Sequence, residues 1–274
     1  MERIFETPAS VELYVELGRG SLNVTAADVG RTTVSLTGKN ADQVSVEQNG
    51  DGISVIAPKE RSGFFGGNES HVDAVITVPS DSRLVTKTGS ADQHAEGRFA
   101  LGNLKSGSGD VSIGEVTGAL VINTGSGAVT VGQSGGDLRL KSGSGDVRIE
   151  HAAGTVGVST GSGDVTIAES EGPVILKSGS GDVAIGIATG EVTAQTASGD
   201  VTVKELVRGS LNSKNASGDI RVGIPAGIPV WTDVNTVSGR IASDLAGAGQ
   251  PDGDQDYIEL RATTVSGDIT LKQL

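Results

Sequence analysis

A triplet of Ser, Gly and Asp recurs along this chain at a nearly constant spacing. Its third residue is Asp110, Asp146, Asp164, Asp182 and Asp200, and Ala128 replaces the aspartate in the copy between the first two. Each step is 18 residues, so the sequence has an 18-residue period. Asp92 lies one such period before Asp110. The spacing then widens, with a 19-residue step to Asp219, a 21-residue step to Arg240 and a 28-residue step to Asp268. Self-similarity at a fixed period of this size predicts a repeat architecture in which each repeat is one structural unit.

Each 18-residue period contains two nine-residue units of the form Gly-x-Val-x-Ile followed by a turn. The segments GDVSIGEVT and GALVINTGS, residues 109–117 and 118–126, are an example. Two apolar residues stand one residue apart in each unit, as in Val111 and Ile113, and this alternation is typical of a strand with one buried face. The Gly, Ser and Asp residues between them favour turns. The region is therefore predicted to be strand and turn throughout.

The size of one coil follows from a second, longer period. Lysine recurs every 36 residues at Lys105, Lys141 and Lys177 and, one residue late, at Lys214. Asn123, Ser159 and Gln195 occupy the same place in the periods between them. An 18-residue coil would separate stacked lysines by a neutral residue, whereas stacking them directly would bring like charges to about 4.8 Å. A 36-residue coil is the alternative.

Packing geometry favours the shorter coil, because two facing strands with small aliphatic side chains fill the roughly 10 Å between packed sheets. The predicted fold class is therefore all-β: a parallel β-solenoid, or single-stranded β-helix, with right-handed winding, 18-residue coils built from nine-residue strand-turn units, and irregular β caps at both ends. Such a fold is stabilised by many stacked coils, because each one shares its apolar ladder with its neighbours.

Composition agrees with this fold and excludes several functions. Glycine provides 42 of 274 residues, without the every-third-residue spacing of collagen. The formal net charge of -13 argues against nucleic acid as a partner and against docking on anionic lipid. Cysteine is absent, which excludes disulfides and thiolate metal sites. No apolar run approaches the length needed to cross a bilayer, so direct membrane insertion is not expected. The first residues do not resemble a secretory signal, and a cytoplasmic location is predicted.

The repeats become irregular toward both ends of the chain. We expect an N-terminal β cap over residues 1–90 that is continuous with the solenoid, regular repeats over 91–223, and C-terminal coils with a cap over 224–274, all in one β domain. The N-terminal strands are expected at Val11–Leu17, Thr32–Thr37, Val44–Gln48, Ile53–Ala57 and Val72–Val78. The sequence Asn49-Gly50-Asp51-Gly52 indicates a hairpin turn.

Near the C-terminus, Trp231 is predicted to cap the core where the repeat decays. Residues 245–256 read as a polar insertion before two closing strands, Tyr257–Ala262 and Asp268–Lys272.

The sequence resembles a bacterial family of β-strand-repeat proteins that is called "putative adhesin" or Toast-rack. This family is a domain of unknown function. The resemblance covers essentially the whole chain. It is carried by the serial KSGSGDV, TGSGDV and TASGDV units, by the opening FETPASVELYVELGRGSLNVTAAD, by GFFGG before VDAVITVP, and by the closing ATTVSGDITL. The resemblance implies a stacked β-strand fold and a scaffolding role linked to envelope stress or adhesion. It implies no catalytic residues.

The Ser-Gly-Asp ladder is the first candidate site. Rows of carboxylates beside glycine-rich turns suggest calcium, but Asp follows Gly directly here, which differs from the calcium-binding nonapeptide repeat. The alternative is that each Asp accepts hydrogen bonds from N–H groups of its turn. That structural role is the preferred interpretation.

Two further motifs carry little chemistry. Gly132-Gln133-Ser134-Gly135-Gly136 matches the pattern of a nucleophile elbow, yet strand patterns flank it on both sides where a helix should follow. His71, His94 and His151 are isolated in sequence, so a metal trio would have to assemble by folding. Surface histidines are the simpler interpretation.

Phe64 and Phe65 stand between glycines in an aromatic-poor chain, and they either contact a partner or fold back as part of the N-terminal cap. The predicted function is a non-catalytic scaffold or protein-interaction module, without a cofactor or metal, whose partner is another protein. The alternative is a module that binds calcium or polysaccharide along the Ser-Gly-Asp ladder.

Overall fold

The computed structural model describes residues 1–58, 71–245 and 257–274, which form β-strands and one short 3-10 helix. The all-β prediction is confirmed. In these three ranges no helix has the length and apolar character that crossing a membrane requires. The chain divides into two compact units, Met1–Gly136 and Asp137–Leu274, and each is described by itself.

The first unit contains twelve of the described strands and the helix. They are β1 (Glu2–Glu6), β2 (Glu12–Leu17), β3 (Arg19–Ala27), β4 (Arg31–Lys39), η1 (Ala41–Gln43), β5 (Ser45–Asn49), β6 (Gly52–Ile56), β7 (His71–Pro79), β8 (Ser82–Thr88), β9 (Asp92–Ser106), β10 (Val111–Val116), β11 (Leu120–Thr124) and β12 (Val129–Ser134). The five N-terminal strands expected from the sequence are all present, within two residues of their predicted ends. β1, β3 and β8 were not predicted.

The second unit contains the remaining described strands. They are β13 (Leu138–Ser142), β14 (Val147–Ala152), β15 (Val156–Ser162), β16 (Val165–Ser170), β17 (Val174–Ser180), β18 (Val183–Ala188), β19 (Val192–Ser198), β20 (Val201–Leu206), β21 (Ser210–Ser217), β22 (Ile220–Ile224), β23 (Val230–Ser238), β24 (Ile241–Ser243), β25 (Ile258–Ser266) and β26 (Ile269–Gln273).

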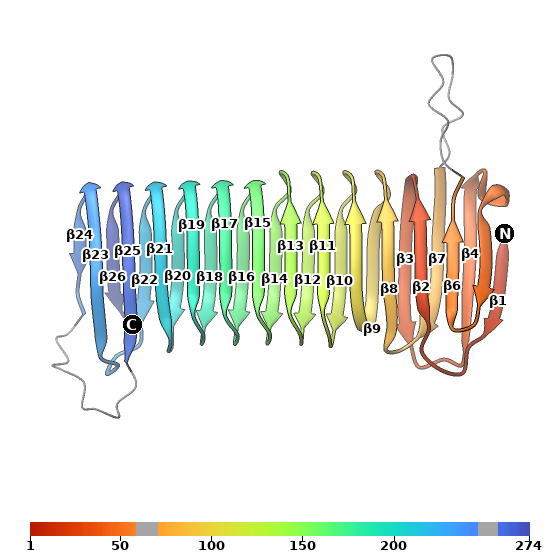
Figure 1. Cartoon of the computed structure of the whole chain (residues 1–274), viewed down its shortest axis with the longest axis horizontal. Coiled ribbons are helices and arrows are strands. Elements are labelled where there is room, and N and C mark those ends of the chain that lie inside the picture. The colour runs from red at the N-terminus through yellow and green to blue at the C-terminus, as the bar shows by residue number, and fades with distance from the viewer. Residues whose placement is uncertain (59–70, 246–256) are drawn as a thin grey trace, which may run out of the picture. The chain divides into compact units, whose positions relative to one another are not determined.

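The second unit is a parallel solenoid of two ladders (Figure 1). Odd-numbered strands from β13 to β21 pair with one another, and even-numbered strands from β14 to β22 form the second ladder. In the second ladder Val147 lies beside Val165, which lies beside Val183, so neighbours in space are one repeat period apart in sequence. The 18-residue coil is confirmed and the 36-residue alternative is wrong. The direction of winding stays a prediction.

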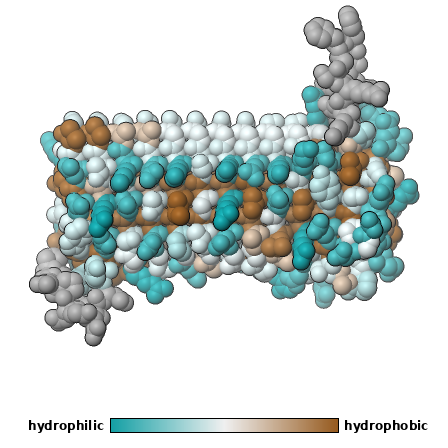
Figure 2. Space-filling view, in the orientation of Figure 1, coloured by the Kyte–Doolittle hydropathy of each residue, from teal (hydrophilic) through white to brown (hydrophobic). Residues whose placement is uncertain are grey.

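The outward row of lysines alternates as predicted. In the second unit Lys141 pairs with Ser159, Ser159 with Lys177, Lys177 with Gln195, and Gln195 with Lys214. Each lysine is therefore two strand spacings from the next, which weakens their mutual repulsion. The displayed face in Figure 2 shows hydrophilic side chains interspersed with pale ones.

The inward residues form the narrow aliphatic core that the repeats predict. In β16, for example, Val165 and Ile167 are 1% and 0% exposed, while Thr166 between them is only half-buried. The glycine of the Ser-Gly-Asp triplet lets the coils stack closely. Gly181 has φ +148°, and a Cβ there would lie 2.2 Å from the carbonyl oxygen of Gly163 one coil earlier. Only glycine fits this approach.

The N-terminal end of the first unit departs from simple stacking. The coil of β2 and β3 lies between the coil of β6 and β7 and that of β8 and β9, because β2 pairs with both β6 and β8, and β3 with both β7 and β9. Three strands finish this end by antiparallel pairing: β4 pairs with β7, β1 pairs with β4, and β5 pairs with β6. The predicted hairpin is confirmed, since Asn49 lies opposite Gly52.

The C-terminal end of the second unit also departs from sequence order. β25 pairs with both β21 and β23, and β26 pairs with both β22 and β24. The last coil of the chain is thus inserted beneath the coil of β23 and β24, which is outermost (Figure 1). The two strands expected to close the fold exist, but the prediction that they are its outermost coil is wrong.

Candidate functional site

The aspartates of the Ser-Gly-Asp triplets form a hydrogen-bonded ladder. In the second unit the backbone N–H of Asp182 donates to Oδ1 of Asp164 at 2.8 Å, and the N–H of Asp200 donates to Oδ1 of Asp182 at 2.8 Å. The same bond joins Asp268 of the inserted coil to Asp219 of the coil beneath it. In the first unit the N–H of Asp110 donates to Asp92. The predicted structural role is confirmed, although the donor belongs to the next coil and not to the same turn.

Part of this ladder carries a compensating cation. Arg221 donates to Oδ2 of Asp200 at 2.7 Å and to Oδ2 of Asp219 at 2.6 Å. The pKa of Asp200 is lowered, first because the backbone N–H of Asp219 donates to its carboxylate and then because Arg221 does, while partial burial acts in the opposite direction. The ladder therefore uses its carboxylates for structure, with one oxygen of each stacked Asp already accepting an N–H.

A second polar ladder lies inside the core and was missed by the sequence reasoning. The residue before each Gly-Ser-Gly or equivalent turn points inward and bonds a turn carbonyl: Oγ of Ser142 donates to the Gly145 carbonyl, and Oγ1 of Thr160 to that of Ser162. Both side chains are buried. At the equivalent position of the next two coils, the hydroxyls of Ser178 and Thr196 have no hydrogen-bond partner. The recurrence of Ser or Thr at this position was the available signal.

The nucleophile-elbow pattern does not form a reactive site. Ser134 is the last residue of β12 and is 1% exposed, and its hydroxyl donates to the carbonyl of Gly136 at 3.1 Å. A buried hydroxyl that bonds its own turn is not presented to a substrate.

The three histidines are not brought together. Nε2 of His71 lies 3.4 Å from Asp73, and Nε2 of His94 lies 2.8 Å from Glu96. His151 instead belongs to a cluster with Glu169 and Glu171, whose ligand atoms all lie within 4.8 Å of one another. The sequence contains the signal for part of this cluster, because His151 and Glu169 are one repeat period apart, which places them side by side on neighbouring coils.

The outermost coil of the second unit leaves its inward face uncovered. In β25, Ile258, Leu260 and Ala262 are each 0% exposed. Their register partners in β23 are Val230 and Val234, which are only half-buried, and Thr232, which is exposed. In the other ladder Ile269 is 0% exposed, whereas its partner Ile241 is 47% exposed. This surface, formed by β23 and β24, is called the open end below.

Among the strands that the structure describes, β23 pairs on one side only, with β25. The N–H of Ile258 donates to the carbonyl of Pro229 at 2.9 Å, so the odd-numbered positions of the strand face β25. Because N–H and C=O groups alternate between the two edges of a strand, those of Val230, Thr232, Val234 and Thr236 point away from β25. Such an edge is a template for another strand.

Trp231 does not cap the core. It lies on the outward face of β23 with 47% of its surface exposed, and the guanidinium of Arg261 lies 5.4 Å from its ring centre. Val237 and Val265 are exposed as well, at 77% and 53%. Figure 2 shows hydrophobic surface at this end of the second unit.

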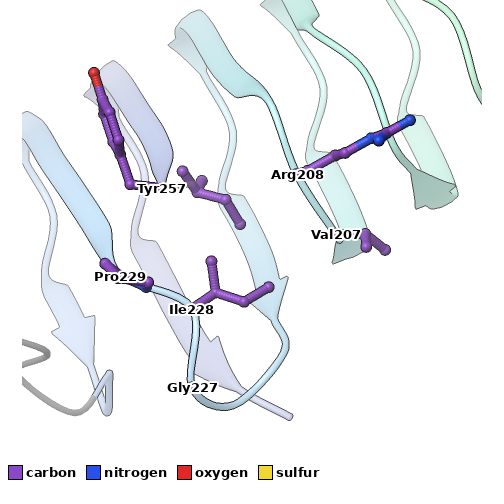
Figure 3. A pocket seen from close by; sticks show the side chains of 7 residues that line it. Val207, Arg208, Gly227, Ile228, Pro229 and Tyr257 are labelled. Atoms are coloured by element: carbon purple, nitrogen blue, oxygen red, sulfur yellow. The ribbon is translucent and has the colours of Figure 1, made fainter. Parts of the chain in front are cut away.

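A shallow pocket of about 330 Å³ lies near the same end (Figure 3). Val207, Ile228, Pro229 and Tyr257 give it a mostly apolar lining. Its one charged residue, Arg208, donates through Nε to the carbonyl of Thr189 at 2.9 Å. The pocket therefore offers apolar contact and little polar chemistry. Phe64 and Phe65, the predicted partner contacts, lie outside the described residues.

Comparison with known proteins gives one family and several similar solved structures. The family model described as Toastrack DUF4097 matches residues 12–272. A "putative adhesin" from Parabacteroides distasonis ATCC 8503 is 12% identical, with 98% of this chain and 96% of that chain covered and a TM-score of 0.49. A second "putative adhesin", from Parabacteroides merdae ATCC 43184, is 14% identical, with 99% and 95% covered and a TM-score of 0.41.

A "putative lipid binding protein" from Parabacteroides distasonis ATCC 8503 is 13% identical, with 99% and 96% covered and a TM-score of 0.38. No curated protein matches this chain. The family model spans nearly the whole chain, so this protein belongs to the Toastrack DUF4097 family.

Proposed function

We propose that this chain is a non-catalytic interaction scaffold that assembles by strand addition at its open end, and that the first occupant of the open end is a second copy of the chain. The observation that carries the proposal is the contrast within one ladder: inward side chains are 0% exposed in β25 and uncovered in β23. Protein strands satisfy such an edge through main-chain hydrogen bonds.

A two-fold axis along the sheet normal fits the open end to itself. This rotation places β23 antiparallel to its copy in the same sheet and does the same for β24, which makes the contact closed and self-complementary. The backbone groups that point away from β25 then face the corresponding edge of the second copy. Inward side chains meet inward side chains, so the two narrow cores become continuous.

The register of this pairing is determined by overlap and charge. Centring the axis on Val234 gives the longest overlap of β23 with its copy, with Asp233 opposite Asn235 of the second copy and Trp231 opposite Val237. Centring it on Asp233 would place that carboxylate opposite itself, which is destabilising. Centring it on Asn235 would shorten the overlap. The arrangement centred on Val234 is therefore the one we propose.

Sedimentation or light scattering of the untagged chain tests this, from low micromolar to millimolar concentration. A dimer that strengthens with salt is expected, because each chain carries a formal charge of -13 that salt screens. Asn235→Asp should weaken the dimer by roughly two- to thirtyfold, because symmetry creates two Asp–Asp contacts. Asn235→Lys should strengthen it.

The control is Gln195→Asp, which adds the same charge on an outward position of β19 away from the open end and should leave the dimer unchanged. A chain that stays monomeric at every concentration contradicts the proposal. So does a dimer that responds equally to the changes at Asn235 and Gln195, because its interface lies elsewhere.

Calcium or polysaccharide along the Ser-Gly-Asp ladder is less favoured, because the stacked carboxylates already accept backbone N–H groups. That alternative predicts a melting temperature that rises with calcium and falls with a chelator. The cytoplasmic location stays a prediction, and fractionation of cells that express the native gene at its own locus tests it.

A further inference from the structure

His151, Glu169 and Glu171 bring one imidazole and two carboxylates to a single place on the second unit. His151 in β14 and Glu169 in β16 are register partners, and Glu171 follows the end of β16 by one residue. Nε2 of His151 lies 3.2 Å from Oε1 of Glu171, and the ligand atoms of all three residues lie within 4.8 Å of one another. The stacking of two coils builds this proximity into the backbone.

The charges of the cluster are incompletely balanced. Within the described residues neither Glu169 nor Glu171 forms an ion pair with a lysine or an arginine, and Glu171 pairs only with His151. The nearby Arg148 is paired with Glu150 at 2.6 Å. Two carboxylates this close repel each other unless a cation lies between them. The surplus negative charge and the ring nitrogen together point to a metal cation.

The donor set selects the kind of ion. Imidazole nitrogen suits zinc, copper and nickel, whereas calcium and magnesium prefer oxygen ligands throughout. Three protein ligands with a fourth position open to solvent are a familiar arrangement for zinc. The ligand atoms of a tetrahedral zinc ion lie about 3.3 Å apart, so rotation of the glutamate side chains is enough to close the cluster. The side chains of His151 and Glu171 are 35% and 55% exposed, which leaves room for that rotation.

The other two histidines show what a simple surface pair looks like. His71 and His94 each lie beside one carboxylate two residues away on the same strand. Among the described residues, neither belongs to a cluster with two carboxylates from a neighbouring coil, as His151 does. We propose that His151, Glu169 and Glu171 form a surface binding site for a divalent transition-metal ion of the zinc class.

Titration of the full chain, without a polyhistidine tag and stripped of metal, tests the proposal with zinc and with cobalt. One equivalent of zinc should bind, and cobalt should give the visible absorption of a low-symmetry site with a nitrogen ligand. His151→Ala should weaken zinc binding at least about tenfold, since even indirect partners of a metal ligand contribute that much. Glu171→Gln, which keeps the size of the side chain, should also weaken it.

His94→Ala is the matched control, because it removes a histidine with a single carboxylate partner and should leave zinc affinity unchanged. The proposal is overturned if the wild-type chain binds no zinc at millimolar concentration, or if His151→Ala and Glu171→Gln bind as the wild type does. Displacement of zinc by equimolar calcium would also overturn it, since the cluster would then act as a non-selective acidic surface. If His151→Ala does not fold, the result with Glu171→Gln decides.

Discussion

The N-terminal end of the first unit and the C-terminal end of the second finish the same kind of ladder in opposite ways. At the N-terminal end Val34 and Leu36 of β4 are 0% and 1% exposed, and Ala41 and Val44 beside η1 are buried. At the C-terminal end Ile241 is 47% exposed and the inward valines of β23 are only half-buried. The first end therefore covers its last aliphatic core residues with the mostly polar strand β1, whose Ile4 is itself 54% exposed, whereas the second leaves its aliphatic face uncovered.

The difference comes from which strands lie outermost at each end. The N-terminal end adds three strands in antiparallel pairs, with β4 on β7, β1 on β4 and β5 on β6, and a helical turn, so it does not present the two edges of a continuing parallel coil. The C-terminal end places the better aliphatic coil, with Ile258, Leu260 and Leu271, inside. It leaves outermost a coil whose inward positions include Thr232 and Ser243. A solenoid end therefore stays available for pairing when its last coil continues the parallel ladder.

The largest expected effect distinguishes the two ends directly. Leu36→Ala should lower the free energy of unfolding by about 2–5 kcal/mol, because it removes a fully buried side chain and leaves a cavity. Val234→Ala should cost less than about 1 kcal/mol in the monomer, because its side chain is only half-buried.

Repeat proteins need not unfold in a single step. Hydrogen exchange followed by mass spectrometry should therefore accompany urea unfolding. Faster exchange is expected in β4 for the first variant and in β23 for the second. Equal losses for the two variants would mean that the ends do not differ in packing.

The next effect compares a glycine in a stacked coil with one beside the open end. Gly181→Ala should cost more than about 3 kcal/mol, because φ is +148° and the new Cβ would lie 2.2 Å from a carbonyl oxygen. Gly227→Ala should cost about 1 kcal/mol, because φ is +82° but no atom lies within 4 Å of the new Cβ. Urea midpoints of the two variants measure the difference, and similar midpoints would show that the stacked turns can move apart.

The sequence predicts the coil well and the ends poorly, for a physical reason. Equal spacing from Asp146 to Asp200 determines which residues stack, since parallel register depends on coil length alone. It does not determine the spatial order of coils, so the insertion of the Asp268 coil between those of Asp219 and Arg240 was not predicted. The widened 28-residue step from Arg240 to Asp268 was the sign of this insertion in the sequence.

The candidate sites divide in the same way. The structural role of the aspartates followed from turn chemistry, but their donors lie one coil away, where local reasoning does not reach. Trp231 was predicted to cap the core because it stands beside a proline where the repeat decays, whereas alternation along β23 places it on the outward face, opposite to Val230 and Thr232. Glu171 joins His151 through the turn geometry after β16, which the repeat period alone does not give.

The smallest expected effect concerns charge, and it compares a stacked aspartate with one at the open end. The pKa of Asp200 is lowered in the folded chain, so its stabilisation is fully present above the unfolded pKa of about 4 and is lost as pH falls through the lower folded value. Asp200→Asn keeps an acceptor for the N–H of Asp219 but loses the charge that pairs with Arg221.

The carboxylate of Asp200 is about one-third exposed, so solvent screening should keep the cost of Asp200→Asn below about 1 kcal/mol at neutral pH. The difference from wild type should shrink toward zero as the solution is acidified below the folded pKa. Asp233→Asn is the comparison, because Asp233 lies on exposed β23 and accepts no N–H from a neighbouring coil in the described residues. Urea unfolding from pH 2 to 7 measures both. A difference for Asp200→Asn that persists undiminished at the lowest pH would mean that side-chain packing, and not the charged ladder, stabilises the stacked turns.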